Sequence, residues 1–158
     1  MSAVAAATDR SALATQVVER FLNAHRRGDV AAMVALCDED AELRYPGFEA
    51  WGKQRVVHGN GKAHTIGRVI WTGMVAAFPD IGNEVRSIDA GVDGDVVAEV
   101  LLTGTQAGPW GVVGGSGKSF AVPQLFVFQV SKAGLIEAIA AYWDNASLYR
   151  QLGHAEVD

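Results

Sequence analysis

Residues 85–103 read VRSIDAGVDGDVVAEVLLT, and this stretch decides the fold class. On both sides of Asp93-Gly94, apolar and polar side chains alternate with a period of two, which is typical of half-buried strands. Because glycine supplies the positive φ of a tight turn, the stretch predicts an antiparallel hairpin. Residues 120–130 and 135–144 repeat the pattern and predict a second pair of strands.

The earlier part of the chain has helical periodicity instead. Residues 10–27 carry apolar side chains every three or four positions, and Gly28 supplies a C-terminal stop. Asp29 is the expected N-cap of a short second helix over residues 30–36. A third helix is predicted over residues 63–78, with apolar residues around so much of its circumference that it must lie across a sheet.

Between the second and third helices the pattern is less regular. Residues 41–45 alternate like a strand, which Pro46 is expected to end because proline cannot donate to a sheet. Residues 47–61 include four glycines and predict a long irregular loop over a pocket. Helices first and antiparallel strands after them predict an α+β domain.

Length and composition fit one globular domain. The chain has 158 residues, of which 49% are hydrophobic and 20% are charged. We expect a single domain over residues 10–153, a flexible N-terminus over residues 1–9 and a flexible tail over residues 154–158. The formal charge is −5, and the 13 Lys and Arg residues form no basic stripe, which argues against a nucleic-acid partner.

Nothing in the chain predicts export or a membrane partner. Cys37 is the only cysteine, which excludes an intramolecular disulfide and suits a reducing cytoplasm. Residues 1–8 lack the basic start and long apolar run of a signal peptide. No apolar run approaches the ~20 residues that span a bilayer, so we expect a soluble cytoplasmic protein.

Several short sequences resemble a known family in their order and spacing. They are Ala76-Ala77-Phe78-Pro79-Asp80, Leu102-Thr103-Gly104-Thr105, Gly117-Lys118, Tyr142-Trp143-Asp144 and Leu148-Tyr149-Arg150-Gln151-Leu152-Gly153. Over residues 17–153 the chain resembles the SnoaL-like polyketide cyclases, which share a fold with nuclear transport factor and ketosteroid isomerase. The resemblance implies three N-terminal helices on a strongly curved antiparallel sheet, forming a cone-shaped barrel with an internal pocket.

The resemblance also implies chemistry without a metal or an organic cofactor, in which carboxylate and histidine side chains move protons. In the cyclases a late-strand aspartate is the proposed acid/base, and Asp144 is the nearest match. Beside Tyr142 in an apolar cavity, its carboxyl pKa would rise by desolvation. The alternative is that Asp144 caps a following helix through Ser147 and never meets a ligand.

Two positions argue against the chemistry of ketosteroid isomerase. Phe21 stands where that family has its oxyanion-stabilising tyrosine, and Tyr45 replaces its general-base aspartate before the proline. Phenylalanine cannot donate a hydrogen bond and tyrosine is a poor base, so steroid-type isomerisation is not expected. Tyr45 is expected instead to donate a hydrogen bond to developing oxyanion charge. The arginine–aspartate pair of limonene epoxide hydrolase is also missing from residues 96–102.

Aromatic residues and one amide are candidates to bind the substrate. Phe126 stands where the cyclases commonly have a histidine or an acid, so the pocket wall should be apolar, with Gln124 as its polar contact. Core packing is the alternative for Phe126, and equally for Trp110. The predicted substrate-binding residues are Phe21, Trp71, Trp110, Gln124, Phe126 and Tyr142.

Among the four histidines, His58 and His64 flank the start of the third helix and are candidate proton shuttles beside Asp144 or Tyr45. Their spacing fits no metal pair, so no metal site is predicted. His25, near the end of the first helix, and His154, in the tail, are expected at the surface.

The sequence therefore predicts a cofactor-independent cyclase or isomerase of secondary metabolism, acting by general acid–base catalysis on a hydrophobic polyketide-like or aromatic molecule. The alternatives are a non-catalytic small-molecule-binding or dimeric interaction module, and an epoxide-opening cyclase or hydrolase. Relatives are often dimers through the sheet, so a homodimer is expected.

Overall fold

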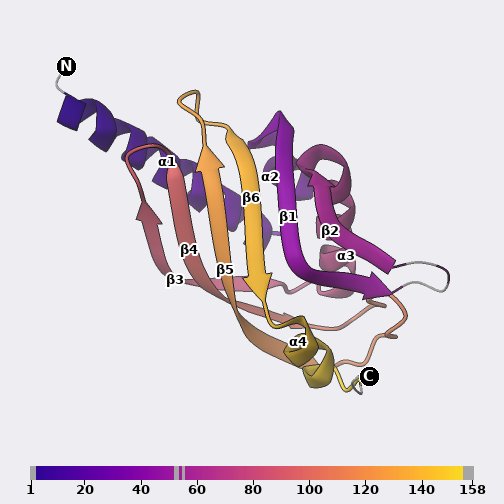
Figure 1. Cartoon of the computed structure of the whole chain (residues 1–158). Helices are drawn as coiled ribbons and strands as arrows, with labels where there is room; N and C mark the ends of the chain where they lie inside the picture. Colours follow the sequence, from indigo (N-terminus) through magenta and orange to yellow (C-terminus); the bar gives the residue numbers. More distant parts are fainter. Residues whose placement is uncertain (1–2, 52–53, 55, 155–158) are drawn as a thin grey trace.

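A computed structural model describes residues 3–51, 54 and 56–154 (Figure 1). Four α-helices, one π-helical turn and six strands occur in it. In chain order they are α1 (Ala3–Arg26), α2 (Val30–Ala35), β1 (Cys37–Trp51), β2 (Val56–Lys62), η1 (Ala63–Gly67), α3 (Arg68–Ala77), β3 (Gly82–Ala90), β4 (Asp95–Thr105), β5 (Ser119–Val130), β6 (Ile136–Trp143) and α4 (Asn145–Gln151). Apart from His154, the tail predicted over residues 154–158 lies outside the described residues.

The six strands form one sheet in the order β2-β1-β6-β5-β4-β3. β1 and β6 run parallel, and the other neighbouring pairs are antiparallel. The predicted α+β class and N-terminal helices are confirmed. The prediction of an antiparallel, strongly curved barrel is wrong, because β1 enters beside β6 in the same direction and the sheet stays open, with β2 and β3 at its edges.

Local signals in the sequence account for several boundaries. Gly28 has a φ of 64° just after α1, and the side chain of Asp29 accepts a hydrogen bond from the N–H of Ala32, capping α2. Gly94, with a φ of 91°, makes the turn between β3 and β4, so the predicted hairpin is confirmed.

The loop predicted over residues 47–61 is instead mostly strand. β1 continues through Pro46 to Trp51, and the register between β1 and β2 shifts between Tyr45 and Glu49. Proline is tolerated in such an irregular stretch because its missing N–H removes no regular ladder bond. Gly59 pairs with Tyr45, and a Cβ at Gly59 would lie 2.8 Å from the Tyr45 carbonyl oxygen, so glycine permits this close approach.

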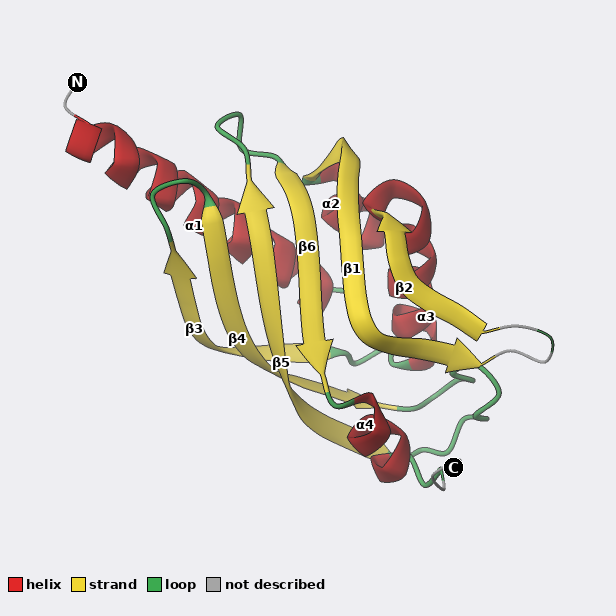
Figure 2. Cartoon of the chain, viewed as in Figure 1, coloured by secondary structure: helices red, strands yellow, loops and turns green. Residues whose placement is uncertain are grey.

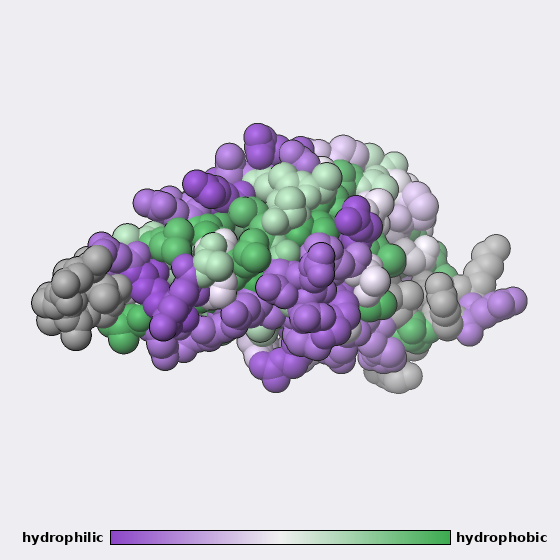
Figure 3. Space-filling view, turned by 90° about the horizontal axis from the view of Figure 1, so that it is seen from above, coloured by the Kyte–Doolittle hydropathy of each residue, from purple (hydrophilic) through white to green (hydrophobic). Residues whose placement is uncertain are grey.

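Helices α1, α2 and α3 lie on one face of the sheet, whereas α4 lies at the end of β6 (Figure 2). α1 contacts β3, β4 and β5, whereas η1 contacts β1 and β2 and leads directly into α3. The side chains that point from the sheet toward these helices form a buried core of mainly aliphatic and aromatic residues. The molecular surface seen from above is a mosaic of hydrophilic areas with hydrophobic areas between them (Figure 3). No helix in the described ranges is long and apolar enough to cross a bilayer.

Candidate functional site

Aromatic side chains from α1, α3, β1, β5 and β6 meet between the helices and the sheet. The ring centroids of Phe21 and Trp71 lie 5.5 Å apart, and those of Phe21 and Phe126 lie 6.2 Å apart. On the other side, the rings of Tyr45 and Trp143 are edge to face at 5.6 Å. We call this group the aromatic cluster; its members are Phe21, Tyr45, Trp71, Phe126 and Trp143.

Tyr45 brings a hydrogen-bond donor into the aromatic cluster. Its side chain is buried, and its oxygen accepts a hydrogen bond from the Trp71 indole N–H at 3.0 Å. Burial raises the pKa of Tyr45 above its usual value, so the hydroxyl keeps its proton near neutral pH. The described part of the chain provides no acceptor for that proton, which leaves Tyr45 able to donate to a bound molecule.

Gln124 brings an acceptor to the same region. It lies on β5, two residues before Phe126, and pairs with Trp143 of β6. The side chain is 4% exposed, and its buried Oε1 atom has no hydrogen-bond partner among the described residues. Since most buried polar atoms are hydrogen-bonded, this oxygen needs an explanation.

His25 lies one helical turn after Phe21 on α1, and its ring packs against Phe126 with centroids 6.3 Å apart. It is 5% exposed, so the prediction that His25 lies at the surface is wrong. Burial, and then the neighbouring Arg26 cation, lower the pKa of His25 to about 4. The imidazole is therefore neutral at pH 7.

Asn83 of β3 determines which nitrogen of His25 carries the proton. The Asn83 Oδ1 atom accepts from the Arg26 guanidinium at 2.6 Å, so its amide nitrogen faces Leu22 O at 3.0 Å and His25 Nδ1 at 2.7 Å. Since the amide nitrogen donates, Nδ1 must accept, and the neutral ring carries its proton on Nε2. The neutral His25 ring, which packs against Phe126, can therefore donate a hydrogen bond only through Nε2.

A hollow of about 180 Å³ opens between α3 and the segment after β4. Phe48, Ile70 and Trp110 are among its lining residues. The Phe48 ring contacts both Trp110, at 5.6 Å, and Trp143, at 6.1 Å. Phe48 therefore connects this hollow with the aromatic cluster.

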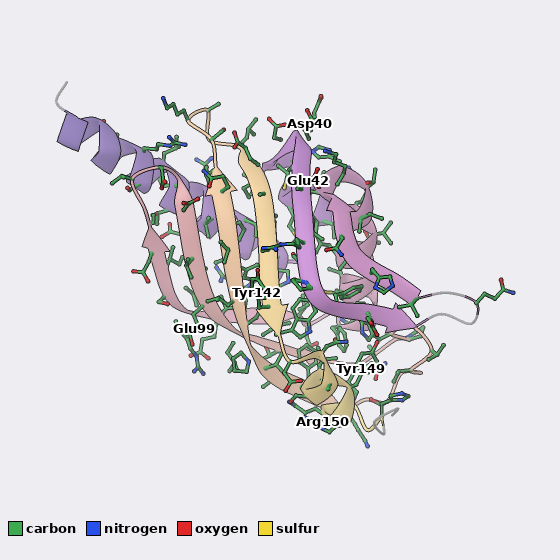
Figure 4. All side chains as sticks on the ribbon, viewed as in Figure 1. Asp40, Glu42, Glu99, Tyr142, Tyr149 and Arg150 are labelled. Atoms are coloured by element: carbon green, nitrogen blue, oxygen red, sulfur yellow. The ribbon has the colours of Figure 1, made fainter. Side chains whose placement is uncertain are left out.

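Asp144 and Tyr142 do not lie in an apolar interior, contrary to the prediction. Tyr142 is 40% exposed on the sheet face turned away from the helices, where it accepts a hydrogen bond from Arg44 at 2.9 Å (Figure 4). Asp144 is exposed, and its Oδ1 atom accepts from the Ser147 N–H at 2.9 Å, which caps α4. The alternative predicted for Asp144, a helix cap, is confirmed.

The other predicted residues also have defined positions. His58 is exposed on β2, and His64 Nε2 lies 3.0 Å from the carbonyl oxygen of Cys37. Neither histidine makes a ring contact with the aromatic cluster within the described ranges. Trp110 is buried between Phe48 and Phe78 and also lines the hollow, so it packs and forms a rim at once.

The structure thus brings together five of the predicted residues. These are Phe21, Tyr45, Trp71, Gln124 and Phe126. It adds Trp143, His25 and Asn83, which the sequence pattern did not indicate as site residues.

The buried polar groups restrict the chemistry that is available. Among the described residues the buried polar side chains are His25, Asn83, Gln106 and Gln124, so none is a carboxylate. Burial raises the pKa of the Cys37 thiol to about 12, so a thiolate nucleophile is not available there. In the described ranges no group of three or more His, Cys, Asp or Glu side chains is arranged to hold a metal ion.

A family model described as a SnoaL-like domain matches residues 18–144. No curated protein matches the chain significantly.

Solved structures share the fold over most of the chain. One is IdmH from Streptomyces antibioticus, a putative polyketide cyclase, with 23% identity, a TM-score of 0.72, and coverage of 89% of this chain and 98% of IdmH. A second is SalBIII, an epoxide hydrolase/cyclase-like enzyme in pyran ring formation in the polyether salinomycin, with 20% identity, a TM-score of 0.65, and coverage of 85% and 92%.

A third is a protein of ketosteroid isomerase-like fold from Catenulispora acidiphila, in complex with trimethylamine. Its identity is 14% and its TM-score 0.70, with coverage of 88% of this chain and 93% of that protein. All three identities lie below 25%, so these likenesses show the fold alone.

Proposed function

The chain belongs to the SnoaL-like family, and from this premise we propose that it is a cofactor-independent enzyme of secondary metabolism. It binds an apolar, carbonyl-bearing molecule of polyketide-like or aromatic type at the aromatic cluster and catalyses its ring closure or isomerisation. Tyr45 donates a hydrogen bond to the carbonyl oxygen as negative charge develops there. The observation that carries the proposal is the buried Tyr45 hydroxyl, which Trp71 orients and for whose proton the described residues provide no acceptor.

The setting of Tyr45 favours this role. A donor held in place in an apolar site costs no reorganisation as charge develops, and removing one such donor typically costs about 3 kcal/mol of transition-state stabilisation. The Trp71 hydrogen bond restrains the hydroxyl, and the Trp143 ring packs against the Tyr45 ring in an edge-to-face contact. Tyr45→Phe removes the donor while it keeps the ring contacts.

Two versions of this proposal differ in the group that takes up the substrate's proton. In the first, Asp144 is the acid/base, as its position in the family motif suggests, and it must leave its capping position on α4 to reach a ligand. In the second, the acidic proton of the substrate passes to solvent, and the Tyr45 hydroxyl donates a hydrogen bond to the enolate oxygen that forms. The lack of a buried carboxylate among the described residues favours the second version.

A test uses two related probes, tetralin and 1-tetralone, which differ by one carbonyl group. We expect 1-tetralone to quench the fluorescence of the wild-type tryptophans at lower concentration than tetralin, and Tyr45→Phe to weaken 1-tetralone binding about tenfold but not tetralin binding. Exchange of the C2 protons of 1-tetralone in D₂O, followed by NMR, measures catalysis of enolisation. Equal effects of Tyr45→Phe on tetralin and 1-tetralone would contradict the assignment of the donor.

A non-catalytic binding module is the second candidate function, and the neutral interior is the observation that favours it. It predicts binding of 1-tetralone without faster C2 exchange and without products from any candidate substrate. Epoxide-opening chemistry, suggested by the likeness to SalBIII, is distinguished by ¹⁸O-labelled water, because hydrolysis incorporates the label and intramolecular ring closure does not.

We further propose that the chain forms a homodimer through the sheet face turned away from the helices. Val97, Leu125 and Tyr142 are each about 40% exposed, and strand pairing places them in neighbouring positions with Val127 and Ala140. Glu99 and Tyr142 mark this face in Figure 4. Leu125→Glu should convert a dimer into a monomer in sedimentation equilibrium, whereas Val92→Glu, in the β3–β4 turn, should not.

A further inference from the structure

We infer that Gln124 selects hydroxylated ligands: its buried Oε1 accepts a hydrogen bond from a ligand hydroxyl, so the substrate carries a donor as well as the carbonyl that Tyr45 binds. This inference rests on the proposed function, because it requires a ligand at the aromatic cluster. The ligand is then a hydroxyketone, whose hydroxyl is either phenolic or aliphatic.

The position of Gln124 in its strand is the first argument. The residues of β5 that point toward the helices are buried, and apart from Gln124 they are all apolar. They are Phe120, Val122, Gln124, Phe126, Phe128 and Val130. A buried glutamine in such a row raises the free energy of the fold unless its amide is hydrogen-bonded. A methionine or leucine would fill the same space without that cost.

Among the described residues, the strand partners of Gln124 do not satisfy its oxygen. Its partner on β4 is Val100, which has no polar side chain. Its partner on β6 is Trp143, whose indole N–H already donates to Asn145 Oδ1 at 3.3 Å. The indole N–H of Trp71 is likewise engaged by Tyr45.

A second buried glutamine shows what a structural role looks like in this chain. Gln106 is 1% exposed, and both ends of its amide are engaged. Its Nε2 donates to the carbonyl oxygen of Val113 at 3.1 Å, and its Oε1 accepts from the Ser116 hydroxyl at 2.8 Å. Gln124 has no comparable hydrogen bond in the described part of the chain. Its missing partner is therefore a bound molecule.

Tyr45 and Gln124 are complementary in chemistry and lie on either side of Trp143. Trp143 contacts the Tyr45 ring and pairs with Gln124 across the sheet. Tyr45 offers a proton and Gln124 offers a lone pair. A hydroxyketone satisfies both, whereas a ligand without a hydroxyl leaves the Gln124 oxygen unpaired. Sites that hydrogen-bond a substrate hydroxyl discriminate strongly against analogues that lack it.

The first experiment compares 5-, 6- and 7-hydroxy-1-tetralone with the three matching methoxy-1-tetralones, because an ether accepts but does not donate. For the wild-type protein we expect at least one hydroxy compound to bind at least about tenfold more tightly than its methoxy partner. Gln124→Leu should abolish that preference and keep the binding of 1-tetralone itself. Equal affinity of all three pairs for the wild type would overturn the inference.

The second experiment uses Gln106→Leu as the matched control and needs no ligand. Gln124→Leu should leave the Tm unchanged or raise it, because the variant removes an unpaired polar group. Gln106→Leu should lower the Tm by several degrees, because it leaves its partners unsatisfied. Similar losses of Tm in both variants would show that Gln124 has a structural partner, and would overturn the inference.

The two experiments also separate this inference from the proposed function. If 1-tetralone binds in a Tyr45-dependent way but no hydroxy compound is preferred, the inference about Gln124 is wrong and the proposed function stands. If no tetralone binds at all, both are overturned. A hydroxyl preference that survives Gln124→Leu assigns the selection to another residue, and the inference then fails alone.

Discussion

His25 should make the stability of the protein depend on pH in a specific window. In the folded chain, burial and the Arg26 cation lower its pKa from 6.5 to about 4. As the pH falls below 6.5, the unfolded chain therefore takes up a proton that the folded chain does not. The free energy of unfolding must decrease between about pH 6.5 and pH 4, and this group contributes no further change below pH 4.

The size of the effect follows from the two pKa values. One pKa unit corresponds to about 1.4 kcal/mol, so a decrease from 6.5 to about 4 amounts to about 3 kcal/mol over the whole window. At pH 5 the loss should already be about 2 kcal/mol. Because small domains are stable by only about 5–15 kcal/mol, such a loss is easily measured.

The assay is urea unfolding of the wild type and His25→Gln at pH 7.5, 6.5, 5.5 and 4.5. Glutamine does not ionise and can still accept from Asn83, so the variant keeps the hydrogen bond to the β3 amide. Carboxylates titrate in both proteins, and the difference between the two pH slopes isolates His25. Parallel loss of stability in both proteins would refute the reasoning, as would an NMR titration of His25 with a midpoint near 6.5.

The remaining predictions concern the cap of α4, the β1–β2 contact and the pH profile of binding. Asp144→Ala should lower the free energy of unfolding by about 1 kcal/mol in urea unfolding, whereas Asp144→Asn should not, because asparagine still caps the helix. Lost turnover in the asparagine variant would support an acid/base role for Asp144. Gly59→Ala should lower the free energy of unfolding by about 1–3 kcal/mol in the same assay, because the added methyl would lie 2.7 Å from the Tyr45 Cβ. Gly114→Ala is the control and should have little effect, because a Cβ there would have no atom within 4 Å. Binding of 1-tetralone should not change between pH 5.5 and pH 9 in fluorescence titrations, because His25 and Tyr45 keep their protonation states there; a sigmoidal profile would contradict the neutral site.

Where the sequence pattern was unambiguous, it predicted the structure well. Gly28, Asp29 and Asp93-Gly94 mark boundaries through backbone geometry and capping, which depend on a few neighbouring residues. The alternation over residues 41–45 likewise placed Tyr45 on the same buried face as Leu43. These features are local, so a single sequence is sufficient to predict them.

The prediction failed where long-range contacts decide the outcome. The glycines of residues 47–61 suggested a loop, yet Gly59 is required because the Tyr45 backbone approaches it from the neighbouring strand. His25 follows Phe21 by four residues, so it continues the buried stripe of α1, but only the packing of Asn83 from β3 shows that this end of the helix is covered.

The orientation of β6 was not determined by its sequence. Residues 138–141 read Ala-Ile-Ala-Ala, a run without polar residues, so alternation cannot tell which face points inward. The pairing with β5 also shifts near Val130, which changes the phase of the strand. As a result Ile139, Ala141 and Trp143 are the residues turned toward the core, and Tyr142 points outward.

The outward orientation of Tyr142 and the exposure of Asp144 change the kind of chemistry that the interior favours. With Asp144 at the surface, the polar groups that the described residues place next to the aromatic cluster are the Tyr45 hydroxyl, the Gln124 amide and the neutral His25 imidazole. None of the three carries a charge at pH 7, and an ionised ligand would lose its hydration without gaining an opposite charge. The site should therefore select neutral oxygen-bearing molecules through the direction of their hydrogen bonds. An acid/base role for Asp144 would additionally require the first turn of α4 to rearrange, because the same carboxylate caps that turn.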